Sequence, residues 1–384
     1  MLIKKIVIFE CKISLGFKYS TWTNNESRSI LIKIETDEGL IGWGEYVVNR
    51  WNTKKILEKE IYYLLNKNPI TILNKPISKI VGIKYIDEWL IGFDRRRRLV
   101  REGLSIALYD LVGKINNKPF YELLGSKKRN EVEGMPVIHV FDKEKRIQIL
   151  KKWEELGYRN FKIKLTGVLK DDIKVLENLL LNKENESKIV IIDANYGYKN
   201  KDDICKLSFF AKENNINYLQ DPIKLSIHST AKLMSKCDYK FTADNTAWWP
   251  NSKRVIDENA CAIVNHHPNI QGGLDWLMKT ANYAKAKGIP NIIGSSGTFG
   301  IQNAAFQGMS AITGIGYPCE EIGLVPYYDY LKEYYSFSDR PNVLKEDYLL
   351  NNGKIVISSK PGLGIEVDEK KVKRFAVWSK EFYA

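Results

Sequence analysis

The chain has 384 residues, of which 44% are hydrophobic and 27% are charged, and this composition excludes a largely disordered protein. The formal net charge of +13 makes nucleic-acid binding worth considering. The only dense basic cluster is "DRRRRLVRE", residues 94–102, and it leads into a helical pattern, so we interpret it as a solvated helix face. We therefore expect no nucleic-acid partner; the alternative is a binder that uses Arg95–Arg98 and depends strongly on salt. The dispersed positive charge favours an acidic small substrate.

The sequence indicates no membrane segment and no cysteine-based site. No apolar run approaches about 18 residues, and the run near the N-terminus is too short for a signal peptide. We therefore expect a cytoplasmic protein without a membrane partner. The cysteines lack CxxC spacing, so we predict neither a zinc site nor a disulfide framework. The five thiols expected to be buried are Cys11, Cys205, Cys237, Cys261 and Cys319.

Residues 1–128 are predicted to form an α+β capping domain. "SILIKIETDEGLIGWGEY", residues 29–46, predicts two alternating strands around a Thr-Asp-Glu-Gly turn, and helical segments then run to Gly125. The tail, residues 331–384, contains "NGKIVISSKPGLGIEVDEKKVKRF", which again indicates strands and turns. We expect the tail to return to the cap.

Residues 129–330 are predicted to form an α/β fold, a (β/α)8-type (TIM-like) barrel. Short apolar runs that end in polar residues alternate with amphipathic helical segments at even spacing, as a parallel barrel requires. The eight runs are residues 135–141, 158–165, 188–195, 216–222, 239–245, 261–268, 289–297 and 316–323.

Three of these runs end in oxygen-bearing side chains. Asp193 ends one strand, Gln220 or Asp221 the next, and Asp244 the third. The carboxyl ends of barrel strands converge on one face, and oxygen ligands there suit a hard cation such as Mg²⁺. Each carboxylate alone could instead cap the following helix. Three in succession favour a metal site.

Two lysines and a histidine are candidates for proton transfer. Lys162 and Lys164 are two residues apart on a strand and therefore point to the same side. Repulsion between them is expected to lower the pKa of one, so that it can act as a base near neutral pH. His267 ends a strand across the barrel, beside His266, and is either an acid on the opposite face or a structural histidine.

These residues lie within a series of motifs that together carry a resemblance. The chain resembles the enolase superfamily, in particular the mandelate racemase and muconate lactonizing enzyme group, over nearly its whole length. The motifs are "TDEGLIGWGE", "GLSIALYDLVGKINNKPFYELLG", "GYRNFKIKL", "DANYGY", "QDP", "ADN", "NIQGGL" and "PGLGIEVDE".

The resemblance implies a mechanism and roles for the residues. In this family, three acidic strand ends bind Mg²⁺, with Mn²⁺ as an alternative, and the ion holds the carboxylate of a small substrate. A base removes the proton on the α-carbon, and the ion stabilises the enediolate. The resemblance places Asp193 and Asp244 among the metal ligands and Lys164 at the base position, with Lys162 beside it. It also implies a homo-oligomer.

The sequence departs from the family at the middle metal ligand and on the opposite face. The middle ligand is normally Glu, and here it is Gln220, with Asp221 one step on; a neutral amide should bind Mg²⁺ more weakly unless Asp221 turns inward. His267 stands where relatives often have Lys or Asp. The seventh strand end, "GSSGTFG", has no histidine, so an acid on that face has to be His267.

The expected activity is Mg²⁺-dependent removal of a proton α to a carboxylate, by a racemase, epimerase or cycloisomerase. The alternatives are an acid-sugar dehydratase of the same superfamily and a ligand-binding homologue without turnover, which Gln220 would favour. Substrate contacts are expected from residues beside the metal and in the cap loops. They are Asn195, Tyr19, Trp22, Arg50, Trp51 and, for a cationic part of a substrate, Glu320 and Glu321.

Overall fold

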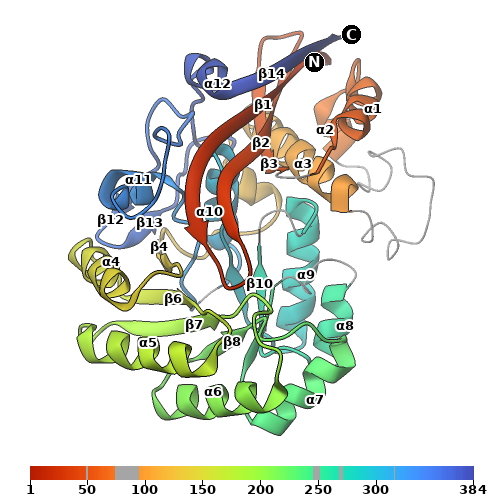
Figure 1. The fold of residues 1–384 in the computed structure, drawn as a ribbon. Coiled ribbons are helices and arrows are strands. Elements are labelled where there is room, and N and C mark those ends of the chain that lie inside the picture. The colour runs from red at the N-terminus through yellow and green to blue at the C-terminus, as the bar shows by residue number, and fades with distance from the viewer. Residues whose placement is uncertain (49–50, 74–94, 245–250, 268–270, 315) are drawn as a thin grey trace.

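The computed structural model describes residues 1–48, 51–73, 95–244, 251–267, 271–314 and 316–384 (Figure 1). Arg50, one of the expected substrate contacts, lies outside these residues. No helix within these ranges is long and apolar enough to cross a membrane.

A four-stranded antiparallel sheet covers one end of the molecule (Figure 1). Its strand order is β14-β1-β2-β3, so the last strand of the chain pairs with the first and both termini lie together. The predicted hairpin is present between β2 and β3, and Gly39 occupies the turn with φ of +81°. The strands are β1 (Ile3–Lys18), β2 (Thr23–Thr36), β3 (Ile41–Val47) and β14 (Ala376–Tyr383).

Helix α3 (Arg95–Ile115) packs closely on β3. A Cβ atom on Gly44 would overlap the main-chain oxygen of Gly103, so glycine is required for this approach. The remaining helices of this region are α1 (Lys54–Leu64), α2 (Pro69–Leu73) and the 3-10 helix η3 (Phe120–Leu123).

The arginine cluster at the start of α3 is only partly solvated. Arg95 and Arg96 are exposed, but Arg98 and Arg101 are buried. Arg101 pairs with Asp275 at 2.9 Å and lies 3.7 Å from the centre of the Trp276 ring. The prediction of a solvated face was wrong for this part of the helix, because helix α9 (Leu274–Ala286) packs against it.

The larger part of the chain forms a curled parallel sheet in which sequence order equals spatial order. Lys164 is the register partner of Asp193, and Asp193 is the partner of Gln220, so the ends of neighbouring strands are level. The strands are β5 (Val137–Ile138), β6 (Asn160–Lys164), β7 (Lys188–Asp193), β8 (Tyr218–Gln220), β9 (Phe241–Ala243), β10 (Ile263–His266) and β11 (Asn291–Ile293).

The eighth predicted strand, residues 316–323, is reduced to a single bridging residue. Cys319 forms parallel bridges with Ile293 at the end of β11 and with Gly134, which precedes β5 in the chain. Pro318 precedes Cys319 and has no N–H group to donate to a longer ladder, which accounts for the difference.

Helices alternate with these strands and lie outside the sheet (Figure 1). Side-chain caps fix several starts: Asp142 accepts a hydrogen bond from the N–H group of Lys145, and Ser226 from that of Ser229. Besides α9 they are α4 (Lys143–Glu155), α5 (Leu169–Asn182), α6 (Lys201–Glu213), α7 (Ile227–Cys237), α8 (Asn251–Asp257), α10 (Ile301–Ser310) and α11 (Val325–Leu331).

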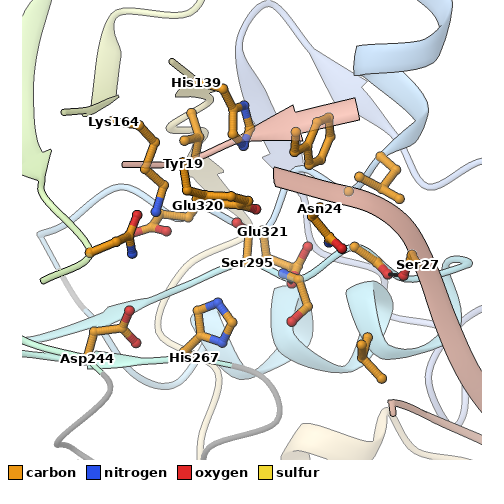
Figure 2. Close-up of a pocket in the computed structure, with 18 of the residues that line it drawn as sticks. Tyr19, Asn24, Ser27, His139, Lys164, Asp244, His267, Ser295, Glu320 and Glu321 are labelled. Atoms are coloured by element: carbon orange, nitrogen blue, oxygen red, sulfur yellow. Dashed lines mark hydrogen bonds between the residues drawn. The ribbon is translucent and has the colours of Figure 1, made fainter. Parts of the chain in front are cut away.

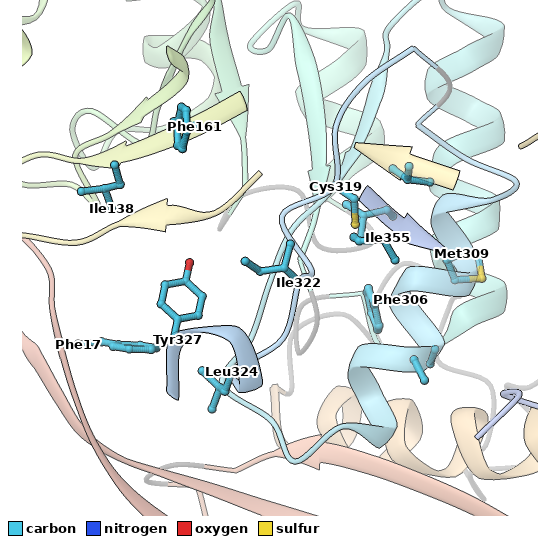
Figure 3. Close-up of a cluster of buried hydrophobic side chains, with 14 of the residues drawn as sticks. Phe17, Ile138, Phe161, Phe306, Met309, Cys319, Ile322, Leu324, Tyr327 and Ile355 are labelled. Carbon is cyan, nitrogen blue, oxygen red and sulfur yellow. The ribbon is translucent and has the colours of Figure 1, made fainter. Parts of the chain in front are cut away.

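The tail contributes to both parts of the molecule. Strands β12 (Leu350–Asn351) and β13 (Lys354–Val356) form a small sheet with β4 (Glu131–Glu133). Helix α12 (Glu369–Phe375) packs on β1, and β14 is the edge strand of the capping sheet beside β1. One buried cluster joins the regions, with Phe17 from the cap, Phe161 from the parallel sheet and Ile355 from the tail (Figure 3).

The cysteine prediction was wrong for one pair. Cys205 on α6 and Cys237 at the end of α7 form a disulfide bond, with Cα atoms 4.7 Å apart. Packing of these neighbouring helices brings the two residues together, which their sequence spacing does not reveal. Cys11, Cys261 and Cys319 are buried thiols, as expected.

Candidate active site

A cavity of about 580 Å³ lies between the carboxyl ends of the parallel strands and the tip of the β1–β2 hairpin (Figure 2). It contains most of the residues that the sequence analysis singled out, although they are far apart in the chain. The lining includes Phe17, Tyr19, Trp22, Trp51, Arg95, His139, Lys162, Lys164, Asn195, Asp244, His267, Ser295, Ser296, Glu320, Glu321 and Tyr327.

Three predicted metal ligands meet beside this cavity. The Nε2 atom of Gln220 donates hydrogen bonds to Oδ2 of Asp193 at 3.0 Å and to Oδ2 of Asp244 at 2.7 Å. All three side chains are at least 95% buried. The amide therefore stands at the centre, with one carboxylate on each side.

Asp221 does not take the central position. Its φ of +43° turns the chain, and its side chain forms a hydrogen bond with the hydroxyl of Tyr196. Its carbonyl oxygen also accepts a bond of 2.6 Å from the N–H group of Tyr196. Of the two alternatives left open by the sequence, the structure brings Gln220 to the carboxylates.

Both lysines of the KxK pair reach the same carboxylate. Lys164 Nζ lies 2.5 Å from Oδ2 of Asp193, and Lys162 Nζ lies 3.3 Å from the same atom. Lys162 also contacts both oxygens of Glu320 at 3.1 Å and the Oε1 atom of Gln220 at 3.0 Å. The two Nζ atoms are thus embedded among acidic side chains.

This environment raises the pKa of Lys162 above its ordinary value. Burial by itself would lower that pKa, but the charges of Glu320, Asp193 and Asp244 outweigh burial. The prediction that mutual repulsion lowers a lysine pKa was wrong for Lys162, because it took no account of the carboxylates at neighbouring strand ends. Lys162 therefore remains an ammonium group.

The two aspartates differ in their electrostatics. Burial raises the pKa of Asp244 to about 7, against the opposing effect of Lys162. Burial acts in the same direction on Asp193, but Lys164 and Lys162 hold its pKa below the usual value. The asymmetry follows from the lysines, which lie closer to Asp193.

The donor set fits a hard divalent cation such as Mg²⁺ or Mn²⁺. Asp193 and Asp244 supply carboxylates, and the Oδ1 atoms of Asp244 and Asn195 are buried without a hydrogen-bond partner among the described residues. Gln220 can contribute its amide oxygen if the amide turns, because Oε1 now faces Lys162 and Asn265. No three His, Cys, Asp or Glu side chains in the described ranges form a metal-binding group.

The two adjacent histidines have different surroundings. His266 is fully buried, its Nε2 atom lies 2.6 Å from Oδ1 of Asn291, and burial lowers its pKa to about 4. His267 lines the cavity from the end of β10, whereas Lys164 enters from β6 (Figure 2). Three strands separate β6 from β10, so the lysine and the histidine enter the same cavity from well-separated strands.

The expected substrate contacts are mostly present in the cavity. Tyr19 and Trp22 stack with ring centres 4.8 Å apart, and Lys164 Nζ lies 5.0 Å from the centre of the Tyr19 ring. Glu320 is engaged by Lys162. Glu321 instead accepts hydrogen bonds from the Ser296 N–H group and from Asn303, and burial raises its pKa to about 8.

Two residues of the site were missed by the sequence analysis. His139 follows β5 and lines the cavity; it is the polar residue of the first apolar run, "MPVIHVF", so the rule applied to the other strands would have found it. Glu45 of β3 is fully buried and accepts main-chain hydrogen bonds from Phe299, Ile301 and Gln302 at 2.7–3.1 Å. Glu45 thereby joins the capping sheet to the loop that follows β11. Local sequence patterns do not reveal this contact, because the partners are far apart in the chain.

Two family models together match most of the chain. The family model "Mandelate racemase / muconate lactonizing enzyme, N-terminal domain" matches residues 3–125, and "Enolase C-terminal domain-like" matches residues 146–371. The chain therefore belongs to the mandelate racemase and muconate lactonizing enzyme group of the enolase superfamily. Its relatives include racemases, epimerases, cycloisomerases and dehydratases, which are isomerases or carbon–oxygen lyases.

Several relatives are similar over nearly their whole length. N-succinyl-L-Arg/Lys racemase of Bacillus cereus is 26% identical, with 94% of each chain covered. L-Ala-D/L-Glu epimerase of Clostridium acetobutylicum is also 26% identical, with 95% of this chain and 99% of the relative covered. The crystal structure of the Bacillus cereus racemase shares the fold, with a TM-score of 0.85 at 23% identity and full coverage of both chains.

Proposed function

We propose that this protein removes the proton α to the carboxylate of a small substrate, through an enediolate, as a racemase, epimerase or cycloisomerase. The observation that carries the proposal is the entry of Lys164 and His267 into one cavity from separated strands, beside the Asp193, Gln220 and Asp244 cluster. In this proposal residues 129–330 form a complete (β/α)8 barrel, and residues 1–128 and 331–384 form its cap.

Each group has a distinct role in the proposed reaction. Asp193, Asp244 and the Gln220 amide would hold Mg²⁺ or Mn²⁺, which supplies electrophilic stabilisation of the negative charge on the enediolate. Lys164 Nζ takes the α-proton. Lys162 stays an ammonium group because Glu320 lies 3.1 Å away, and it adds positive charge beside the reacting carboxylate.

The residue that returns the proton decides the stereochemical outcome. Return from Lys164 restores the original configuration, whereas delivery from His267 on the other face inverts the centre. A substrate with a leaving group on the β-carbon would instead lose that group, and a single base suffices for such an elimination.

The alternatives are an acid-sugar dehydratase and a ligand-binding homologue without turnover. D-xylonate dehydratase of Haloferax volcanii is 24% identical over 91% of this chain. This similarity supports the alternative in which the enzyme eliminates a group from the β-carbon. The seventh loop presents Ser295 and Ser296 to the cavity, and neither is a histidine, which favours His267 as the acid on that face. The neutral amide of Gln220 is the feature that favours the ligand-binding alternative.

Solvent deuterium exchange tests the proposal. N-acyl amino acids, dipeptides and acid sugars are incubated in D₂O with and without Mg²⁺ or Mn²⁺, and exchange at the α-carbon is followed by NMR. We expect exchange in at least one carboxylate class and its loss in Lys164→Ala. Undiminished exchange in Lys164→Ala would contradict the assignment of the base.

A further inference from the structure

His139 is held rigidly in the wall of the active-site cavity. It is 96% buried, stacks on Phe17 with ring centres 4.3 Å apart, and meets the edge of Tyr19 at 5.4 Å. Figure 2 shows the imidazole beside Tyr19 and above the carboxylates of the cavity. Nothing in the proposed proton transfers uses this side chain.

The hydrogen bonds of His139 are compatible with a tautomer that carries its proton on Nε2. Its Nδ1 atom lies 3.2 Å from the hydroxyl oxygen of Tyr335, and this oxygen also accepts a bond from the main-chain N–H group of His139. The hydroxyl proton of Tyr335 is free to point at Nδ1, and in that arrangement Nδ1 is the acceptor. That arrangement corresponds to the tautomer with hydrogen on Nε2, which we assign to His139.

The imidazole is also neutral. Burial, followed by the charges of Lys164 and Lys162, lowers the pKa of His139 well below its ordinary value. Within the described part of the chain, no side-chain or main-chain group bonds Nε2. His139 therefore presents an uncharged N–H donor to the cavity, on the same side as Lys164.

The surroundings of this donor restrict what it can bind. Phe17, Tyr19 and Tyr327 line the adjoining wall with aromatic rings. Flat, uncharged groups pack well on such faces, whereas a chain of hydroxyl groups would leave polar atoms unpaired there. A neutral donor among aromatic rings suits a carbonyl oxygen better than a second carboxylate, which needs a positive charge.

We propose that His139 donates a hydrogen bond from Nε2 to the carbonyl oxygen of an acylamino substituent on the substrate α-carbon. The inference rests on the proposed function and narrows its substrate class to N-acyl amino acids and peptides, at the expense of acid sugars. His139 is then a specificity-determining residue, and the aromatic wall receives the plane of the amide group.

The test measures ligand binding separately from turnover. Dissociation constants are obtained by calorimetry for the N-acetyl derivatives of leucine, glutamate and arginine. The derivative that binds best is compared with an analogue in which CH₂–CH₂ replaces the NH–CO group. We expect His139→Phe, which keeps an aromatic ring and removes the donor, to weaken binding of the N-acetyl ligand about 10-fold and to leave the analogue within about 2-fold.

Two further variants separate the donor from packing. His139→Gln offers an amide N–H donor and should recover part of the lost affinity. His228→Phe on α7, outside the cavity lining, should bind both ligands as the wild type does. In turnover, His139→Phe should raise KM with little change in kcat.

Equal weakening of both ligands by His139→Phe, or failure of all three N-acetyl derivatives to bind, would overturn this inference. Deuterium exchange that persists in His139→Phe would then leave the proposed function standing. Conversely, absence of exchange with every carboxylate refutes the proposed function alone, since selective weakening of the N-acetyl ligand still identifies the donor.

Discussion

The most informative perturbation is Gln220→Glu, which restores the charge expected at the middle metal position. In the structure, the Gln220 amide donates to Asp193 at 3.0 Å and to Asp244 at 2.7 Å, while its oxygen accepts from Lys162 at 3.0 Å. A glutamate would lose both donations and place a third carboxylate against two others. The metal-free protein should be destabilised.

The magnitude follows from these separations. At an effective dielectric constant of about 20, two unit charges about 3 Å apart interact by roughly 5 kcal/mol. The glutamate would meet two repulsions and one attraction, from Lys162, and relaxation or proton uptake would reduce the net cost to about 2–3 kcal/mol. A bound divalent cation would be attracted by the carboxylates that repel one another in the metal-free variant. The affinity of Gln220→Glu for Mg²⁺ should therefore be about 30–100-fold higher than that of the wild type.

Calorimetric titration with Mg²⁺ and thermal unfolding with and without a chelator measure both effects. Asp221→Asn is the matched control, since its side chain contacts Tyr196 and should leave Mg²⁺ affinity unchanged. If Gln220→Glu bound Mg²⁺ no more tightly than the wild type, or if Asp221→Asn abolished binding, the assignment of Gln220 as the central residue would be refuted.

Four further outcomes are expected. Lys164→Ala should reduce α-proton exchange by at least about 100-fold, measured by NMR in D₂O, and should still bind Mg²⁺. His267→Asn should still exchange the α-proton, but its product should keep the original configuration, and chiral chromatography should detect no inversion. Burial raises the pKa of Glu321 to about 8, so this group contributes stability that is present below about pH 4 and is lost as the pH rises to about 8. The free energy of unfolding of Glu321→Gln, measured by chemical denaturation, should therefore decline less over this pH range. Cys205→Ser should lower the free energy of unfolding by about 2–4 kcal/mol, whereas Cys261→Ser keeps the disulfide and should lose as much stability as the wild type when a reductant is added.

Much of the site is encoded locally and was predictable. The KxK pair on β6, Asp193 after an apolar run and Asp244 after another all follow from strand periodicity and from the rule that parallel strands end on one face. The hairpin between β2 and β3 follows from its turn residues. These features depend on neighbours in the sequence, so local patterns carry them.

Only the tertiary structure decided how these groups act on one another. The choice of Gln220 over Asp221 depends on a backbone turn at φ of +43°, and the charge of Lys162 depends on Glu320, which comes from the far edge of the sheet. The Cys205 disulfide and the capping of the seventh loop by Glu45 likewise join distant segments. The sequence by itself determined which residues end the strands, because side-chain alternation is a local property. The distances between those ends, and hence their charges and hydrogen bonds, depend on the curling of the parallel sheet and on the packing of the cap against it.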